Sequence, residues 1–167
     1  MKQTLKYILE KIIQMRKFAE EKHSITIALS SGVIVFSSYF ISSQRAEIIF
    51  VSAGSIVFAL ISVLYSFLAL TPKRVKVKSL TDKKDGDLID YMSISKFGIE
   101  NYLEAIKVLY RFPKTYKFDN FDKDLAMQII STAKVVKAKF SYFNFAILFL
   151  AISVICAVIS ICLLAGF

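Results

Sequence analysis

The chain has 167 residues, of which 56% are hydrophobic, and its 22 Lys and Arg outnumber its 13 Asp and Glu to give a net charge of +9. Soluble domains contain about 45–50% apolar residues, so the excess here argues against a soluble globular enzyme. With 5 Gly, 2 Pro and 21% charged residues, the chain is neither collagen-like nor disordered. A basic and apolar chain favours contact with an anionic membrane surface over nucleic acid.

Three stretches are long and apolar enough to cross a membrane, at 24–42, 47–70 and 141–167. At 1.5 Å per residue, about 20 residues span a hydrocarbon core of about 30 Å. The sequence therefore predicts an all-α membrane protein with a transmembrane hairpin over 24–70 and a third transmembrane helix over 141–167. The alternative for 1–42 is a secretory signal peptide, which Glu10, Glu20 and Glu21 in the leading segment disfavour.

Charge placement predicts the orientation. Residues 1–23 and 71–140 together hold 21 of the 22 Lys and Arg, and only Arg45 lies in the connection between the first two spans. Positive residues collect on the cytoplasmic side of membrane proteins. We therefore expect a multi-pass protein in the lipid bilayer, with a cytoplasmic amino terminus and the carboxyl terminus outside.

The segments outside the spans are predicted to be helical. Residues 1–23 place Leu5, Ile8 and Ile12 on one face of an amphipathic helix, and no Pro or Gly separates it from the first span. A helix lying on the membrane surface is the alternative. The 71–140 region contains one helix between Gly98 and Pro113. A second, capped by Asp119 or Asn120, runs into the third span over roughly 45 residues, about 68 Å. We expect a small cytosolic helical bundle formed by extensions of the first and third spans plus a short helix.

The segment that follows the second span is strongly polar. A basic strip at 73–78 is expected near anionic headgroups, with a short strand as the alternative. Residues 82–87 have the superficial look of a calcium loop, but Lys84 stands where an oxygen ligand is needed, so the sequence argues against calcium there.

Catalytic and metal sites are not indicated by the sequence. The single histidine, His23, falls at a membrane edge, and Cys156 and Cys162 lie within an apolar span. No phosphate loop, metal-ligand spacing or catalytic triad pattern occurs. We expect a protein that is not an enzyme and has no metal or cofactor.

Small, often hydroxylated residues recur along the first two spans. They are predicted to form helix-packing or pore-facing stripes and comprise Ser31 and Ser38 in the first span and Ser52, Ser55, Ala59, Ser62 and Ser66 in the second. Small residues let helices approach closely in lipid. The stripes are explained either by packing of the hairpin or by contact with a second subunit or a water-filled path. The absence of charge between 48 and 71 disfavours a selective ion channel.

The 71–140 region also mixes aromatic and basic side chains, which suit a nucleotide because a base can stack and a phosphate can pair with cations. Candidate ligand residues are Tyr91, Lys96, Tyr102 and Arg111. The alternative is that the tyrosines are core residues and the lysines are solvated.

Several segments support a family resemblance. They are Ile89-Asp90-Tyr91, Ile94-Ser95-Lys96-Phe97, Glu100-Asn101-Tyr102-Leu103, Asp124-Leu125-Ala126-Met127-Gln128-Ile129 and Lys137-Ala138-Lys139-Phe140. With the order of the spans, they make the chain resemble the Pycsar-type bacterial transmembrane effectors, the PycTM-like family, over nearly its whole length.

The resemblance implies an effector of anti-phage defence (abortive infection) in the bacterial inner membrane. The ligand it implies is a cyclic pyrimidine nucleotide made by a partner cyclase, to which the effector responds by assembling or repacking its spans, as a homo-oligomer, and impairing membrane integrity. The alternative is a non-enzymatic, membrane-anchored scaffold whose cytosolic bundle binds a protein partner.

Overall fold

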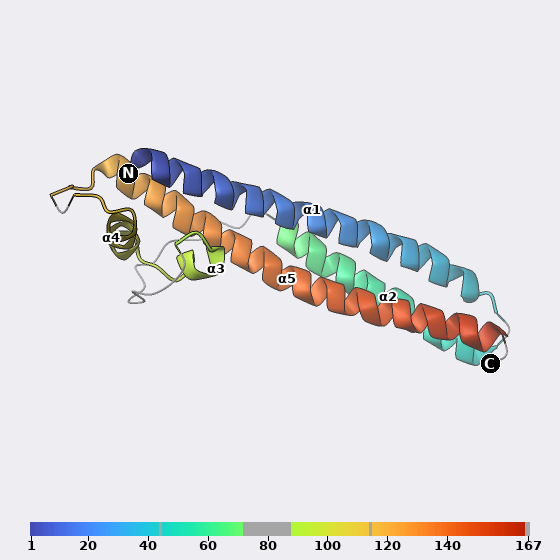
Figure 1. The fold of residues 1–167 in the computed structure, drawn as a ribbon. Coiled ribbons are helices and arrows are strands. Elements are labelled where there is room, and N and C mark those ends of the chain that lie inside the picture. The colour runs from blue at the N-terminus through green and yellow to red at the C-terminus, as the bar shows by residue number, and fades with distance from the viewer. Residues whose placement is uncertain (44, 72–87, 114, 166–167) are drawn as a thin grey trace. The chain divides into compact units, whose positions relative to one another are not determined.

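The computed structural model describes residues 1–43, 45–71, 88–113 and 115–165. This part of the chain contains helices α1 (Lys2–Phe40), α2 (Ala46–Leu70), α3 (Tyr91–Ile94), α4 (Ile99–Leu109) and α5 (Asn120–Ala165), and it includes no strand (Figure 1). The predicted all-α class is confirmed. The basic strip at 73–78 and the loop at 82–87 lie outside the described residues.

Three of the helices can cross a membrane. An apolar window long enough for a span occurs in α1, α2 and α5, with mean hydropathies of 1.3, 2.4 and 3.1. α2 has 25 residues, about 37 Å at the helical rise, which covers the hydrocarbon thickness with a turn to spare. The predicted three-span membrane architecture is therefore confirmed, and α1 is the least apolar of the three spans.

α1 and α5 are far longer than a membrane needs. α1 has 39 residues and α5 has 46, and each is one unbroken helix. Neither carries a proline, which would remove a backbone donor and break the helix. The prediction that the first and third spans extend as helices beyond the bilayer is confirmed.

The chain divides into two compact units. Unit 1 comprises Met1–Phe18 and Lys73–Lys139, and unit 2 comprises Ala19–Pro72 and Phe140–Phe167. The unit boundaries thus fall inside α1 and α5, so each of these helices belongs to both units.

The core of unit 1 contains buried side chains from all of its helices. They are Leu5, Ile8 and Ile12 of α1, Ile94 of α3, Tyr102, Leu103 and Ile106 of α4, and Leu125, Ala126, Ile129, Ile130, Ala133 and Val136 of α5. The i, i+3, i+4 spacing within α1, α4 and α5 is typical of helices that bury one apolar face, and the face expected at Leu5, Ile8 and Ile12 is buried as predicted. Not every apolar residue near these faces is buried, because Phe18, Leu109, Tyr110 and Phe121 are exposed. Burial of these faces holds α3 and α4 against the two long helices.

Two helices of unit 1, α3 and α5, begin at an acidic cap. The Asp119 Oδ1 accepts the backbone N–H of Asp122 at 2.8 Å, and Asp122 Oδ2 lies 3.4 Å from the Asp119 nitrogen. This reciprocal pair is a capping box, which satisfies donors that the first turn of α5 leaves open. Asp90 caps α3 by accepting the Ser93 N–H at 3.1 Å. α3 itself was not predicted, because four residues are too few to show a periodic pattern.

Unit 2 is a three-helix packing of the membrane spans. α2 runs antiparallel to α1, because Ser62 meets Ser30 while Ser55 meets Ser37. α2 is also antiparallel to α5, because Ser55 meets Ser153 and Ser52 meets Ser160. The three segments lie side by side (Figure 1).

Candidate functional site

The buried face of α2 is the most polar feature of the membrane spans. Ser52, Ser55, Ala59, Ser62 and Ser66 are all fully buried, and they recur at alternating steps of three and four residues. All five belong to the stripe expected from the sequence. The structure places them against α1 and α5 of the same chain.

The middle of this face joins all three helices. Ser55 Oγ donates to the Ser153 carbonyl at 2.8 Å, and Ser153 Oγ donates back to the Ser55 carbonyl at 2.7 Å. Because the Ser55 hydroxyl proton is used there, Ser37 Oγ donates to Ser55 Oγ at 2.9 Å. The Ser55 layer therefore has hydrogen bonds from α2 to both α1 and α5.

Two further layers flank it. On the Leu70 side, Ser30 Oγ donates to Ser62 Oγ at 3.1 Å, and Ser62 Oγ donates to the Ala146 carbonyl at 2.7 Å. On the other side, Ser52 Oγ donates to Ser160 Oγ at 3.0 Å, and Ser160 Oγ donates to the Cys156 carbonyl at 3.1 Å. We call the buried hydroxyls of Ser30, Ser37, Ser52, Ser55, Ser62, Ser66, Ser153 and Ser160 the serine column.

The predicted stripe of α1 lies elsewhere. Ser31 and Ser38 are exposed, and their hydroxyls donate to the carbonyls of Ile27 and Ile34 in the same helix, at 2.9 and 2.7 Å. The contacts to α2 come instead from Ser30 and Ser37. Each of these precedes a predicted residue by one position, and one position rotates the side chain by about 100°. Sequence reasoning missed them because serine occupies both positions of each pair.

Ser66 differs from the other members of the column. Its side chain is fully buried on the same face of α2, but its Oγ makes no hydrogen bond within the described residues. The antiparallel register that pairs Ser30 with Ser62 continues one turn further to Thr26, whose Oγ1 donates to the Lys22 carbonyl at 2.9 Å. Near the Leu70 end of α2, the column therefore contains a buried hydroxyl, that of Ser66, without a hydrogen-bond partner within the described residues.

Aromatic side chains surround the same end of the spans. The buried His23 ring meets the Phe143 ring edge to face with centroids 5.7 Å apart, and Lys22 Nζ lies 5.1 Å from the centroid of Phe143. Tyr65 stacks on Phe145 and Phe149, with centroids 5.6 Å apart in both cases. Rings and snorkelling lysines of this kind are typical of a membrane interface.

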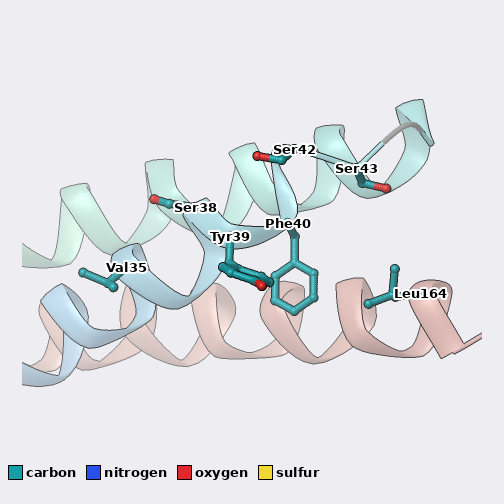
Figure 2. Close-up of a pocket in the computed structure, with 7 residues that line it drawn as sticks. All are labelled: Val35, Ser38, Tyr39, Phe40, Ser42, Ser43 and Leu164. Carbon is teal, nitrogen blue, oxygen red and sulfur yellow. The ribbon is translucent and has the colours of Figure 1, made fainter.

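The opposite end of unit 2 holds Arg45. Its Nη1 donates to the Leu163 carbonyl at 3.0 Å, which places a cation on the open carboxyl-terminal turn of α5. A groove of ≈ 740 Å³ adjoins this end, and Figure 2 shows its lining side chains: Val35, Ser38, Tyr39, Phe40, Ser42, Ser43 and Leu164. Its residues come from the end of α1, the connection that follows and the end of α5.

The candidate ligand residues lie in different environments of unit 1. Tyr102 is fully buried, and its hydroxyl donates to the Leu88 carbonyl at 3.2 Å. Burial raises the pKa of Tyr102. Its ring is thus a core element and is not open to a stacking base in this arrangement. Tyr91 is half-buried and Lys96 and Arg111 are exposed, so these three remain accessible.

Arg111 has an unusual backbone. Its φ is 53°, and among the described residues it is the one non-glycine side chain with a positive φ. The Arg111 N–H donates to the Val108 carbonyl at 3.2 Å, and the Phe112 N–H donates to the Lys107 carbonyl at 3.0 Å. These bonds are a Schellman motif, in which glycine normally holds the left-handed position. Because Arg111 has a side chain, holding this left-handed backbone conformation costs it conformational free energy.

A polar cluster lies at the start of α5. Asp122 is fully buried, and its Oδ2 accepts a hydrogen bond from the Tyr116 hydroxyl at 2.8 Å. This bond, with burial and the nearby carboxylates, raises the pKa of Tyr116 to about 12. Lys2 Nζ lies 2.7 Å from Asp119 Oδ2, and their hydrogen bond raises the pKa of Lys2 and lowers that of Asp119. Within the described residues, no three His, Cys, Asp or Glu side chains group as a metal site would require.

Comparison with known proteins identifies the family. No curated protein and no solved structure matches the chain. The family model PycTM, the Pycsar effector protein domain, matches residues 4–166. Its match covers all three spans and the helices of unit 1, which confirms the resemblance found in the sequence. The chain therefore belongs to the PycTM family and is a multi-pass membrane effector of bacterial anti-phage defence.

Proposed function

We propose that this protein is a non-enzymatic effector that responds to a cyclic pyrimidine nucleotide in the cytosol by repacking or assembling its membrane spans, which impairs the inner membrane. Family membership supports the defence role and the membrane setting. The response to a nucleotide and the loss of membrane integrity are the steps we add.

The continuity of α1 and α5 carries this proposal. Each helix contributes to the core of unit 1 and then continues as a membrane span in unit 2. A helix is stiff over several turns, so a ligand that changes the packing of unit 1 also shifts or rotates two of the three spans. A ligand can drive such a change only by its differential affinity for the two packings.

The orientation follows from charge. Residues 1–23 and 71–140 carry nearly all of the positive charge, so we place them and unit 1 in the cytosol, where a cyclase product accumulates. The carboxyl terminus then lies outside.

The accessible candidates for the ligand are Tyr91, Lys96 and Arg111. A half-buried tyrosine can stack on a base, and the two cations can pair with the single phosphate charge. We expect Lys96→Ala and Arg111→Ala to weaken nucleotide binding by about tenfold or more, as loss of a charge-assisted hydrogen bond does. Lys123→Ala, which also removes an exposed cation of unit 1, is the matched control and leaves binding unchanged.

Assembly into a homo-oligomer is part of the proposal. α1 exposes Ser24, Ala28, Ser31 and Ser38 to lipid, although it is the least apolar span. Small residues on a lipid-facing surface permit close approach of another helix. Ser31→Leu would block such an approach and is expected to suppress the nucleotide response.

The decisive experiment uses purified protein in liposomes loaded with a fluorescent dye. We expect release with cyclic UMP or cyclic CMP, and none with cyclic AMP, cyclic GMP or with the nucleotide in protein-free liposomes. Liposomes that stay tight with all four nucleotides would refute the proposal. Co-purification of an inert protein with a specific partner would favour the scaffold alternative.

A further inference from the structure

The serine column has the length of a transmembrane path. Ser52 and Ser66 are separated by 14 positions of one helix, about 21 Å, within a hydrocarbon core of about 30 Å. Along this length the buried face of α2 presents hydroxyls at four of five positions. Hydroxyls from both neighbouring helices form separate polar layers along this length, with buried apolar side chains such as Ala59, Leu150 and Ala157 between them.

The lipid-facing surfaces of α2 and α5 are apolar by contrast. Exposed positions of α2 include Val57, Leu60 and Leu64, and those of α5 include Ile155 and Val158. At the depth of these residues, the exposed faces of α2 and α5 that the structure describes give water no run of hydroxyls comparable with the column. On α1, the exposed Ser24, Ser31 and Ser38 all donate to carbonyls of their own helix, so none of them calls for a further partner.

Ser66 provides an independent sign of where water enters. A buried hydroxyl without a partner lowers the stability of the folded state, and a water molecule removes this cost by donating and accepting hydrogen bonds. Ser66 lies one turn from Leu70, the end of α2 from which the chain continues into unit 1. It is the member of the column closest to that end.

The column can also open at low cost. A serine hydroxyl that loses its interhelical partner can donate to the carbonyl four residues earlier, as Ser31 and Ser38 already do. Each interhelical hydrogen bond in a membrane contributes little to the stability of the packed helices. Separation of the three layers therefore leaves no hydroxyl stranded.

We propose that the serine column is the water path of this effector, closed by its three hydrogen-bonded layers and entered at Ser66 from the Leu70 end of α2. The inference rests on the proposed function for its activated state, but the resting state of Ser66 can be tested without it. In the resting protein water reaches Ser66 only, and on activation it reaches Ser62 and Ser55.

Thiol accessibility tests the path, because a thiol reacts as the thiolate and ionises only where water reaches it. In full-length protein carrying Cys156→Ala and Cys162→Ala, single substitutions Ser66→Cys, Ser62→Cys and Ser55→Cys are made. Leu64→Cys and Leu68→Cys are lipid-facing controls on either side of Ser66. Proteoliposomes are treated with a membrane-impermeant thiol reagent on the side that carries residues 73–139, and dye release is recorded in parallel.

The resting arm has two outcomes. We expect the Ser66→Cys thiol to react faster than both controls, by about tenfold over Leu64→Cys. If depth in the membrane alone set the reaction rate, the rate of Ser66→Cys would lie between those of Leu68→Cys and Leu64→Cys. That result would overturn the entry site, whether or not any nucleotide acts on the protein.

The activated arm separates the path from the function. With cyclic UMP or cyclic CMP, the Ser62→Cys and Ser55→Cys thiols are expected to become reactive while the shallower Leu64→Cys does not. Dye release with both column thiols still protected would overturn the path and leave the proposed function standing. Protected thiols without release under any nucleotide would count against the proposed function, and the resting arm would still decide the inference.

Discussion

Replacing Arg111 with glycine is expected to stabilise unit 1. The left-handed backbone conformation costs a non-glycine residue about 1–2 kcal/mol, and glycine avoids this cost. Arg111 adopts it with a φ of 53° at the end of α4. Glycine also loses more backbone conformational entropy on folding, which reduces the gain by about 0.5–1 kcal/mol. The net expectation for Arg111→Gly is a gain of about 1 kcal/mol.

Amide hydrogen exchange measures this gain locally. The amides of α4 exchange through opening of the helix, and 1 kcal/mol corresponds to an opening equilibrium about fivefold less favourable. Arg111→Ala is the matched control, because it removes the guanidinium but keeps the left-handed cost. We expect its α4 protection to remain within about 0.5 kcal/mol of the parent chain.

The pair of variants also separates conformation from ligand contact. If the Arg111 side chain pairs with a phosphate, Arg111→Gly and Arg111→Ala weaken nucleotide binding equally while only the first stabilises α4. Equal protection of α4 in the two variants would refute the reasoning, because it would mean that residue 111 does not hold the left-handed conformation.

The other predictions concern the start of α5 and the spans. Tyr116 is expected to ionise at about pH 12 instead of 10.0, followed as the ultraviolet difference between the parent chain and Tyr116→Phe. The raised pKa favours the protonated phenol in the folded state, so the Tyr116–Asp122 hydrogen bond stabilises the folded chain fully below pH 10.0 and loses this effect as the pH approaches about 12. A Tyr116 titration midpoint near 10.0 would contradict this prediction. Asp119→Ala removes the cap of α5 and is expected to cost unit 1 about 1 kcal/mol in urea unfolding, whereas a change within error would rule out the capping role. Ser55→Ala removes hydrogen bonds to two helices and is expected to destabilise the spans by about 1–2 kcal/mol in detergent, with Ser38→Ala near neutral; equal effects would argue against the column as a packing element.

The lengths of the helices could be predicted from the sequence because each signal is strong on its own. Uncharged runs of about 20 residues fix the spans, and the lack of Pro or Gly between Lys114 and Ala165 predicts the long α5. Asp119 was one of two cap candidates, and its hydrogen bond to Asp122 decides between them.

The faces of the helices were harder to predict. In α2 a single run of small residues marks one face, and that face is buried. In α1 the adjacent pairs Ser30-Ser31 and Ser37-Ser38 put hydroxyls on two faces, so composition and periodicity do not distinguish the packed one. The position of Tyr102 is a similar case, because an amphipathic tyrosine suits both a core and a stacking site, and the tertiary contacts decide.

Serine is well suited to a span that must hold one packing and then leave it. A larger polar group such as asparagine would hold the helices more firmly, but its amide could not satisfy itself on its own helix after separation. The hydroxyls of the three hydrogen-bonded layers can donate to carbonyls of their own helices, as Ser31 and Ser38 do within α1. The same chemistry makes the closed state specific, since Ser55 and Ser153 exchange hydrogen bonds only in one register. A register-specific contact that costs little to break is what a ligand of modest differential affinity can switch.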